Sequence, residues 1–273
     1  MRFVDLELLR RQLPELMKAW QDPDLHKVVV VDGFLRPTAK YEVMHCFPDV
    51  TWDGWDPISN TLQFGKRSCE RIELFPPTLE ALLHELNSSP VIKFLEELTQ
   101  TEGLLPDPHL VGGGLHYMQH GGYLWPHADF LQATNPDLKR MINLVLYVHP
   151  TWTGEMGGNF ERWEGRELVR RISPAPYSCV IFRTDGGSIH GVSQITANCP
   201  RQSIALFYYS VVRKPDVSLD HTTAWSLDLK PPSASIDRGN LFWASMLMRG
   251  SLCLKRGAKY LNKKAEQLVN AGR

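Results

Sequence analysis

Two histidines and one aspartate have the types and the spacing of a metal site. His127 and Asp129 are separated by one residue, and His190 follows much later in the chain. Alternate side chains of an extended strand point to the same face, so His127 and Asp129 can reach one ion from one segment. Two imidazoles and one carboxylate hold one face of Fe(II) and leave the other face open for a co-substrate and O₂. The pattern therefore predicts an iron site.

The segments around these residues add specificity that a lone His-x-Asp lacks. Asp129 ends a run rich in glycine and aromatic residues, 117–129, and His190 lies in the segment 181–191. Arg201 and Ser203 follow at the start of a strongly β-prone run, where alternation places both on one face.

This ordered set resembles the prolyl-4-hydroxylase-like branch of the Fe(II)/2-oxoglutarate-dependent dioxygenases, over about Val28 to Ser210. The resemblance implies a mainly β fold with flanking helices, a double-stranded β-helix or jelly roll, with the iron at its mouth. It also implies that His127, Asp129 and His190 are the metal ligands.

The resemblance further implies a 2-oxoglutarate site. Arg201 would pair with the distal carboxylate of this co-substrate, because a planar guanidinium suits bidentate carboxylate binding. Ser203 and Tyr147 would assist, and Tyr117 is expected to line the same pocket. Many prolyl hydroxylases carry Lys where Arg201 stands, which weakens the prolyl assignment but not that of the co-substrate.

The implied reaction couples decarboxylation of 2-oxoglutarate, with O₂, to hydroxylation of an unactivated C–H bond. Related halogenases replace the carboxylate ligand with a small residue, so the retained Asp129 favours hydroxylation. A small amino acid or a peptidyl residue is the expected substrate, and a sugar or lipid-linked glycan is the alternative. Two other classes stay open: a non-catalytic jelly-roll binding protein and a cupin-type metal enzyme that needs no 2-oxoglutarate. Succinate production separates both from the main interpretation.

Composition fits an ordinary enzyme. The chain has 273 residues, 43% of them hydrophobic, and 30 basic side chains against 30 acidic ones, so no global charge favours nucleic acid or membrane. No segment is apolar enough to span a bilayer, and charges interrupt the first residues. The cysteines are odd in number and lack CxxC spacing, which favours a reducing, cytoplasmic setting: Cys46, Cys69, Cys179, Cys199 and Cys253.

The elements that must position these residues change in type along the chain. Helices are expected over 3–20, interrupted by Pro14, and over three later segments: 37–47, 78–86 and 90–99, the last with Ser89 as N-cap. Short β-rich runs separated by turn residues fill 110–212. The expected division is an N-terminal helix (1–27), the dioxygenase domain (28–228), and a linker with a basic helix (229–273). That helix is expected to pack on the domain, with contact to an anionic surface as the alternative.

Other candidate residues are weaker. His116 and His120 would form a second metal pair only on a helix, which the surrounding glycines disfavour. Six residues are candidates for the substrate entrance: Trp125, Trp152, Trp163, Arg140, Arg162 and Arg183.

Overall fold

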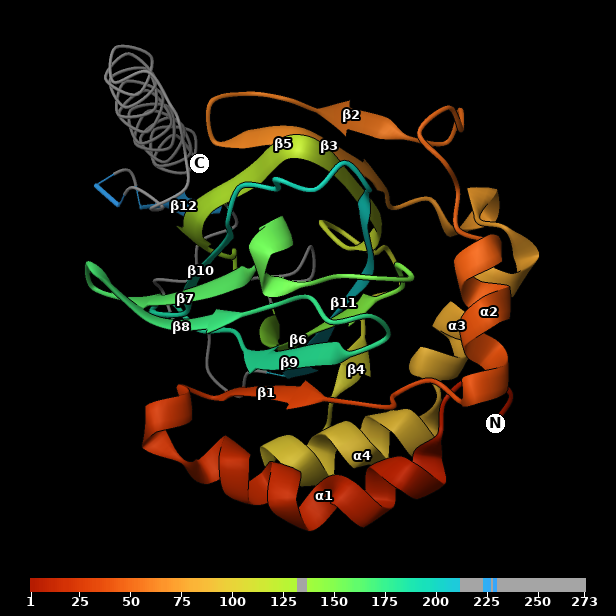
Figure 1. Ribbon diagram of the computed structural model, residues 1–273. Coiled ribbons are helices and arrows are strands. Elements are labelled where there is room, and N and C mark those ends of the chain that lie inside the picture. Colours follow the sequence, from red (N-terminus) through yellow and green to blue (C-terminus); the bar gives the residue numbers. More distant parts are fainter. Residues whose placement is uncertain (132–136, 212–222, 227, 230–273) are drawn as a thin grey trace, which may run out of the picture. The chain divides into compact units, whose positions relative to one another are not determined.

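The computed structural model describes residues 1–131, 137–211, 223–226 and 228–229 (Figure 1). The α-helices are α1 (Leu6–Gln21), α2 (Pro37–His45), α3 (Pro77–Leu86) and α4 (Ser89–Thr99). Short 3₁₀ helices occur at Pro23–Leu25, Ile72–Leu74 and Gly154–Met156. The strands are β1 (Val28–Val31), β2 (Asp56–Ile58), β3 (Gln63–Cys69), β4 (Leu105–Pro106), β5 (Gly114–Ala128), β6 (Leu138–Tyr147), β7 (Phe160–Glu164), β8 (Glu167–Ile172), β9 (Cys179–Arg183), β10 (Ile189–Val192), β11 (Arg201–Val211) and β12 (Ala224–Trp225).

The strands form a curled antiparallel sheet in the order β1-β9-β6-β11-β5-β10-β7-β8. The long strand β5 pairs with β11 through its first half and with β10 through its second half, so it passes from one layer into the other. Phe160 and Ile172 of β7 and β8 pack against Val180 and Phe182 of β9, which closes the two layers over a common interior. The expected jelly roll is confirmed.

Helices pack against the outer face of the sheet layer that contains β1, β9, β6 and β11. Figure 1 shows α1 and α4 side by side below β1. Val29 and Val31 of β1 face these helices in the main core, whereas Val28 faces the interior between the layers. This division follows from the alternation of a strand that is buried on both faces.

The helix predictions are confirmed with small shifts. Helix α1 continues through Pro14, which lies on its exposed side, and Asp5 caps it by accepting a hydrogen bond from the Leu8 amide. The N-cap prediction for α4 was wrong by one position. Ser88 precedes the helix, and its hydroxyl donates to the carbonyl of Glu85 instead of capping the helix. The preceding helix ends at Leu86, and the Glu85 carbonyl in its last turn accepts from both the amide and the hydroxyl of Ser88.

The N-terminal helix shares its core with the sheet. Leu9 and Trp20 belong to the same buried cluster as strands β6, β9 and β11, and the described residues form one compact unit. The linker and basic helix expected over 229–273 lie, from residue 230 on, outside the described residues. Among the described helices, none combines the length and the apolar character needed to cross a bilayer.

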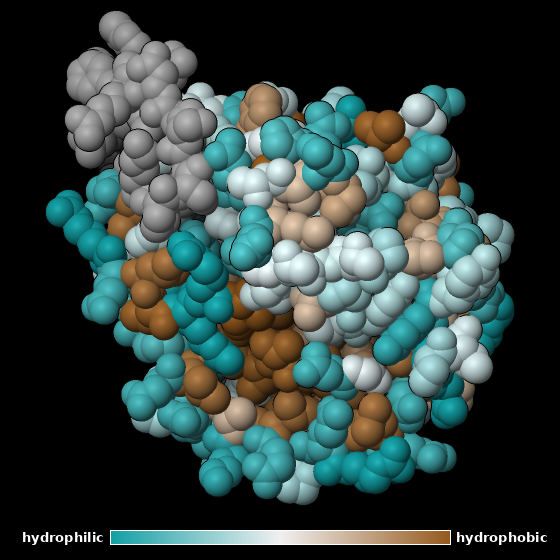
Figure 2. Space-filling view, viewed as in Figure 1, coloured by the Kyte–Doolittle hydropathy of each residue, from teal (hydrophilic) through white to brown (hydrophobic). Residues whose placement is uncertain are grey.

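One face of the described unit has a hydrophobic recess. Figure 2 shows apolar surface there, in the region where Figure 1 places β1, β8 and β9. Strands β1 and β8 are the two ends of the sheet path, and β9 pairs with β1. The two ends of the sheet, β1 and β8, do not pair as strands among the described residues. Instead, the side chain of Arg170 on β8 donates to the carbonyls of Leu25 and Val28.

Candidate iron and co-substrate site

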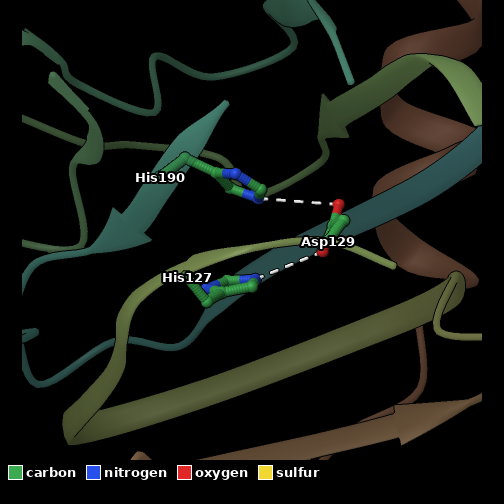
Figure 3. A group of neighbouring side chains, drawn as sticks. All are labelled: His127, Asp129 and His190. Carbon is green, nitrogen blue, oxygen red and sulfur yellow. Dashed lines mark ion pairs between the residues drawn. The ribbon is translucent and has the colours of Figure 1, made fainter. Parts of the chain in front are cut away.

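The three predicted metal ligands converge at the end of β5. His127 and His190 are direct cross-strand partners on β5 and β10, and Asp129 follows β5 immediately. One ligand atom from each residue lies within 4.8 Å of the others. Figure 3 shows both imidazoles directed at the Asp129 carboxylate, with Nε2 of His127 3.3 Å and Nε2 of His190 3.7 Å from its oxygens. These residues could hold one metal ion.

Backbone carbonyls set the tautomer of both histidines. Nδ1 of His127 lies 2.8 Å from the carbonyl oxygen of Trp125, and Nδ1 of His190 lies 2.9 Å from that of Ser188. Nδ1 is therefore the protonated donor, and the lone pair of Nε2 faces the space between the three side chains. This arrangement fits a divalent metal.

The Asp129 carboxylate is held from behind by two donors. The Asn143 side-chain amide donates to Oδ2 over 2.7 Å, and the Arg140 guanidinium lies 3.3 Å from the same oxygen. Thr184 donates in turn to the Asn143 carbonyl oxygen. Hydrogen bonds of this kind orient a metal ligand, and the metal ligands of proteins usually receive them. This arrangement leaves Oδ1 as the better-placed ligand atom.

Charges in the site favour deprotonated ligands. Burial alone would raise the pKa of Asp129, but His190, His127 and Arg140 outweigh it and hold that pKa well below its usual value. Burial lowers the pKa of His190 to about 4, against the opposing attraction of Asp129. At neutral pH Asp129 is thus a carboxylate and His190 a neutral imidazole, the protonation states that metal binding needs.

The buried Arg140 is held between aromatic rings. Its guanidinium carbon lies 3.9 Å from the ring centre of Phe130 and 3.7 Å from that of Phe207. These cation–π contacts replace part of the hydration that the charge loses on burial. Arg140 therefore positions Asp129 and does not belong to an entrance.

Three of the four predicted co-substrate residues lie in the same cavity, namely Arg201, Ser203 and Tyr147. Arg201 is 4% exposed, its Nε donates to the Gly158 carbonyl over 2.9 Å, and one terminal nitrogen donates to the Tyr147 hydroxyl over 3.2 Å. Ser203 pairs across strands with Tyr147. Gly158 has φ +63°, and a Cβ there would meet Cδ of Arg201 at 3.0 Å, so glycine gives the guanidinium its place.

Two buried polar atoms on this wall of the cavity lack a hydrogen-bond partner among the described residues. They are Oγ of Ser203 and Nε2 of His116, and the two residues are direct cross-strand partners. Buried polar groups are normally satisfied, and an unsatisfied one costs about 1–3 kcal/mol. With Arg201 and Tyr147 beside them, they fit a bound polar molecule such as 2-oxoglutarate.

The prediction for Tyr117 was wrong. Tyr117 packs in the main core, 5.8 Å from the ring centre of Trp55, and its neighbours His116 and Met118 line the cavity instead. Tyr117 and His127 are an even number of residues apart, but β5 bulges between Leu124 and His127, which both line the cavity. Between the pairs Val192–Leu124 and His190–His127, two steps of β10 match three of β5, and the odd difference reverses the facing.

The cavity, of about 240 Å³, also contains residues that sequence reasoning missed. Lys66, Ser68 and Glu70 line it from β3 and the residue after it. Burial lowers the pKa of Lys66 to about 8, although Asp129 and Glu70 act in the opposite direction. Trp225 of β12 also lines the cavity, and its ring centre lies 5.0 Å from that of His127.

The other entrance candidates are not at the cavity. Trp125, Trp152 and Trp163 are buried side chains outside its lining. Arg162 is buried and donates to the carbonyls of Gly187 and Ile189, and Arg183 is half exposed beside Asp185. His116 and His120 lie on strand β5, not on a helix, which removes the i, i+4 geometry of a zinc pair.

The buried histidines make stability sensitive to acid. His149 accepts a hydrogen bond from the Gln202 amide and donates to the Pro174 carbonyl, and burial lowers its pKa to about 4 from 6.5. Between these values the unfolded chain binds more protons than the folded one, so stability is lost as the pH falls from 6.5 to 4. His149→Gln should reduce this loss by up to about 3 kcal/mol. Urea unfolding of both proteins across that pH range measures it, and parallel curves would contradict it.

Comparisons with known proteins agree with this geometry. Residues 113–209 match the sequence model of the 2OG-Fe(II) oxygenase superfamily. No protein with a curated description matches the sequence. The matched segment begins just before β5 and ends in β11, so it contains all three candidate metal ligands together with Arg201 and Ser203.

Solved structures share the fold at low sequence identity. A Trichoplax adhaerens prolyl hydroxylase in complex with a hypoxia inducible factor peptide fragment has a TM-score of 0.53 and 17% identity, covering 75% of this chain and 92% of its own. A prolyl 4-hydroxylase from Phytophthora capsici has a TM-score of 0.51 and 19% identity, covering 91% and 75%. The epimerase SnoN, in complex with Fe3+, alpha ketoglutarate and nogalamycin RO, has a TM-score of 0.51 and 13% identity, covering 74% and 84%.

The jelly roll, the convergence of two histidines and an aspartate at its mouth, and the matched segment that contains them lead to one conclusion. The chain carries a domain of the 2OG-Fe(II) oxygenase superfamily and is a 2-oxoglutarate-dependent dioxygenase whose cofactor and co-substrates are Fe(II), 2-oxoglutarate and O₂.

Proposed function

We propose that the protein hydroxylates an unactivated C–H bond of a small amino acid or a peptidyl residue. In this proposal His127, Asp129 and His190 bind Fe(II), and Arg201, Ser203 and Tyr147 bind the distal carboxylate of 2-oxoglutarate. The observation that carries it is the presence of both sets in one cavity. Bound iron, with 2-oxoglutarate and O₂, supplies the oxidising power, and 2-oxoglutarate leaves as succinate and CO₂.

The protein's own residues bind and orient the reactants. Arg201, fixed by Gly158 and Tyr147, presents its remaining N–H groups to a carboxylate, and the free hydroxyl of Ser203 adds a donor. Phe160, Phe182 and Val192 make the wall around His190 apolar, which keeps water from the reacting C–H. Trp225 covers the ring of His127.

Hydroxylation is favoured over halide transfer because Asp129 supplies a carboxylate. Its Oδ1 lies beside Nε2 of His127, while Oδ2 is held by Asn143 and Arg140. A carboxylate in this position occupies the place that a halide would need. The two hydroxylases compared above act on prolyl groups according to their descriptions, which supports an amino acid or peptidyl substrate as the first class to screen.

The test combines the protein with Fe(II), 2-oxoglutarate and a panel of amino acids, short peptides and sugars. We expect one molecule of succinate per molecule of a product heavier by one oxygen atom, even in excess chloride. Labelled O₂ should place label in both product and succinate. A chlorinated product, or succinate with no oxygenated product anywhere in the panel, would contradict hydroxylation. A sugar product would support the alternative substrate class.

A further inference from the structure

One wall of the cavity is built by residues that precede the segment matched to the superfamily. Strand β3 pairs with β5, and its side chains alternate, so that Lys66 and Ser68 face the cavity while Arg67 faces away toward Gln119. Glu70 continues the inward row and accepts a hydrogen bond from the Gly112 amide. The matched residues begin at 113, so Lys66 is a feature of this chain outside the match.

Lys66 presents a free cation to the cavity. Its ammonium group makes no hydrogen bond and no ion pair with any side chain in the described part of the chain. The charges that act on it are Asp129, then Glu70, then Arg201, in order of decreasing effect. An ammonium group in a partly buried cavity loses part of its hydration, which costs free energy when no opposite charge is paired with it. An anionic ligand would compensate for this cost.

The distal carboxylate of 2-oxoglutarate already has its own cation. Arg201 and Lys66 lie on strands β11 and β3, on opposite sides of β5, and both pair with Met118. Two strand spacings, about 10 Å, therefore separate their backbones. The Arg201 guanidinium is also fixed on the far side, toward Tyr147 on β6 and Gly158. This geometry allows the two cations to bind different anions.

The formal charges of the cavity lead to the same conclusion. Its lining has three cationic side chains, Lys66, Arg140 and Arg201, and two anionic ones, Glu70 and Asp129. The two positive charges of Fe(II) balance the two negative charges of 2-oxoglutarate, so the cavity with both bound keeps one net positive charge from its side chains. A substrate with a carboxylate near the reacting carbon would neutralise it.

We propose that Lys66 binds a carboxylate of the substrate, which makes the substrate a free amino acid or another small carboxylic acid rather than an internal residue of a peptide. This inference rests on the proposed function, because it assigns Arg201 to 2-oxoglutarate. Charged hydrogen bonds in a partly buried site discriminate strongly between a carboxylate and its neutral amide. Lys66 is therefore a specificity-determining residue.

The test measures binding, with no turnover. The full-length protein, loaded with Fe(II) and 2-oxoglutarate without O₂, is titrated calorimetrically with free L-amino acids and small carboxylic acids, each paired with its carboxamide. We expect at least one acid to bind roughly 10- to 100-fold more tightly than its amide, the loss expected for one charged hydrogen bond. Lys66→Met should abolish that difference, and Lys66→Arg should restore part of it.

The matched control is Arg67→Met, which removes one positive charge from the opposite face of the same strand. It should leave the preference for acids unchanged. The Kd of 2-oxoglutarate should also be unchanged in Lys66→Met. A Kd of 2-oxoglutarate raised by Lys66→Met would assign the lysine to the co-substrate and overturn the inference. So would equal binding of acids and amides across the panel. Failure of the proposed function is a separate result, namely the absence of succinate from wild-type protein.

Discussion

Replacing His190 with alanine is expected to abolish turnover and to weaken Fe(II) binding by more than about 100-fold. His190 is the only candidate ligand from β10, directly opposite His127, and its loss leaves one imidazole and one carboxylate. Loss of an outer-shell partner alone typically costs about 10- to 100-fold in metal affinity, so loss of a ligand should exceed that range. Fe(II) titration without O₂ measures binding, and succinate formation measures turnover.

Two further variants make this result specific. Asn143→Ala removes the amide that holds Oδ2 of Asp129 but no ligand, so it should weaken Fe(II) binding by only about tenfold. His84→Ala removes an exposed histidine of α3 and should change neither binding nor turnover. Binding and activity like those of wild type in His190→Ala would remove the basis for the iron site.

The metal ligands could be predicted because their arrangement depends on local geometry. His127 and Asp129 are two residues apart at a strand end, which alternation alone places on one side. The partnership of His190 with His127 needed the family resemblance, since spacing does not specify strand pairing. The contacts of Asn143 and Arg140 with the Asp129 carboxylate were missed for the same reason. Arg140 was named only as an entrance candidate, because its packing between Phe130 and Phe207 depends on contacts that residue spacing does not predict.

The two errors on cavity walls have one physical cause, which is uncertainty about which face of a strand points inward. Tyr117 lies ten residues before His127, and the bulge of β5 between Leu124 and His127 reverses the facing expected from that even spacing. Lys66 was missed because the β3 sequence is polar on both faces, with Lys66 inside and Arg67 outside. Without hydrophobic alternation, a sequence does not distinguish the two faces.

The last prediction concerns the co-substrate. Arg201→Ala should raise the KM and the Kd of 2-oxoglutarate by roughly two orders of magnitude, because a charge-assisted bond in a buried site is worth a few kcal/mol and 1.4 kcal/mol is about tenfold. Arg201 is 4% exposed and fixed by Gly158 and Tyr147, so little water can replace it. At saturating 2-oxoglutarate the kcat should fall much less, which separates a binding role from a general loss of structure.

Graded variants test which atoms are responsible for this effect. Arg201→Lys keeps the charge but loses the planar fork, and should raise the Kd about tenfold. Tyr147→Phe removes only the hydroxyl that accepts a hydrogen bond from Arg201, and should raise the Kd several-fold, by about 1 kcal/mol. Arg183→Ala, at the half-exposed end of β9, is the control and should leave the Kd unchanged. An unaltered Kd in Arg201→Ala would mean that another cation holds the carboxylate. Lys66 would then be the residue to examine, because it is the other cavity cation that does not pair with Asp129.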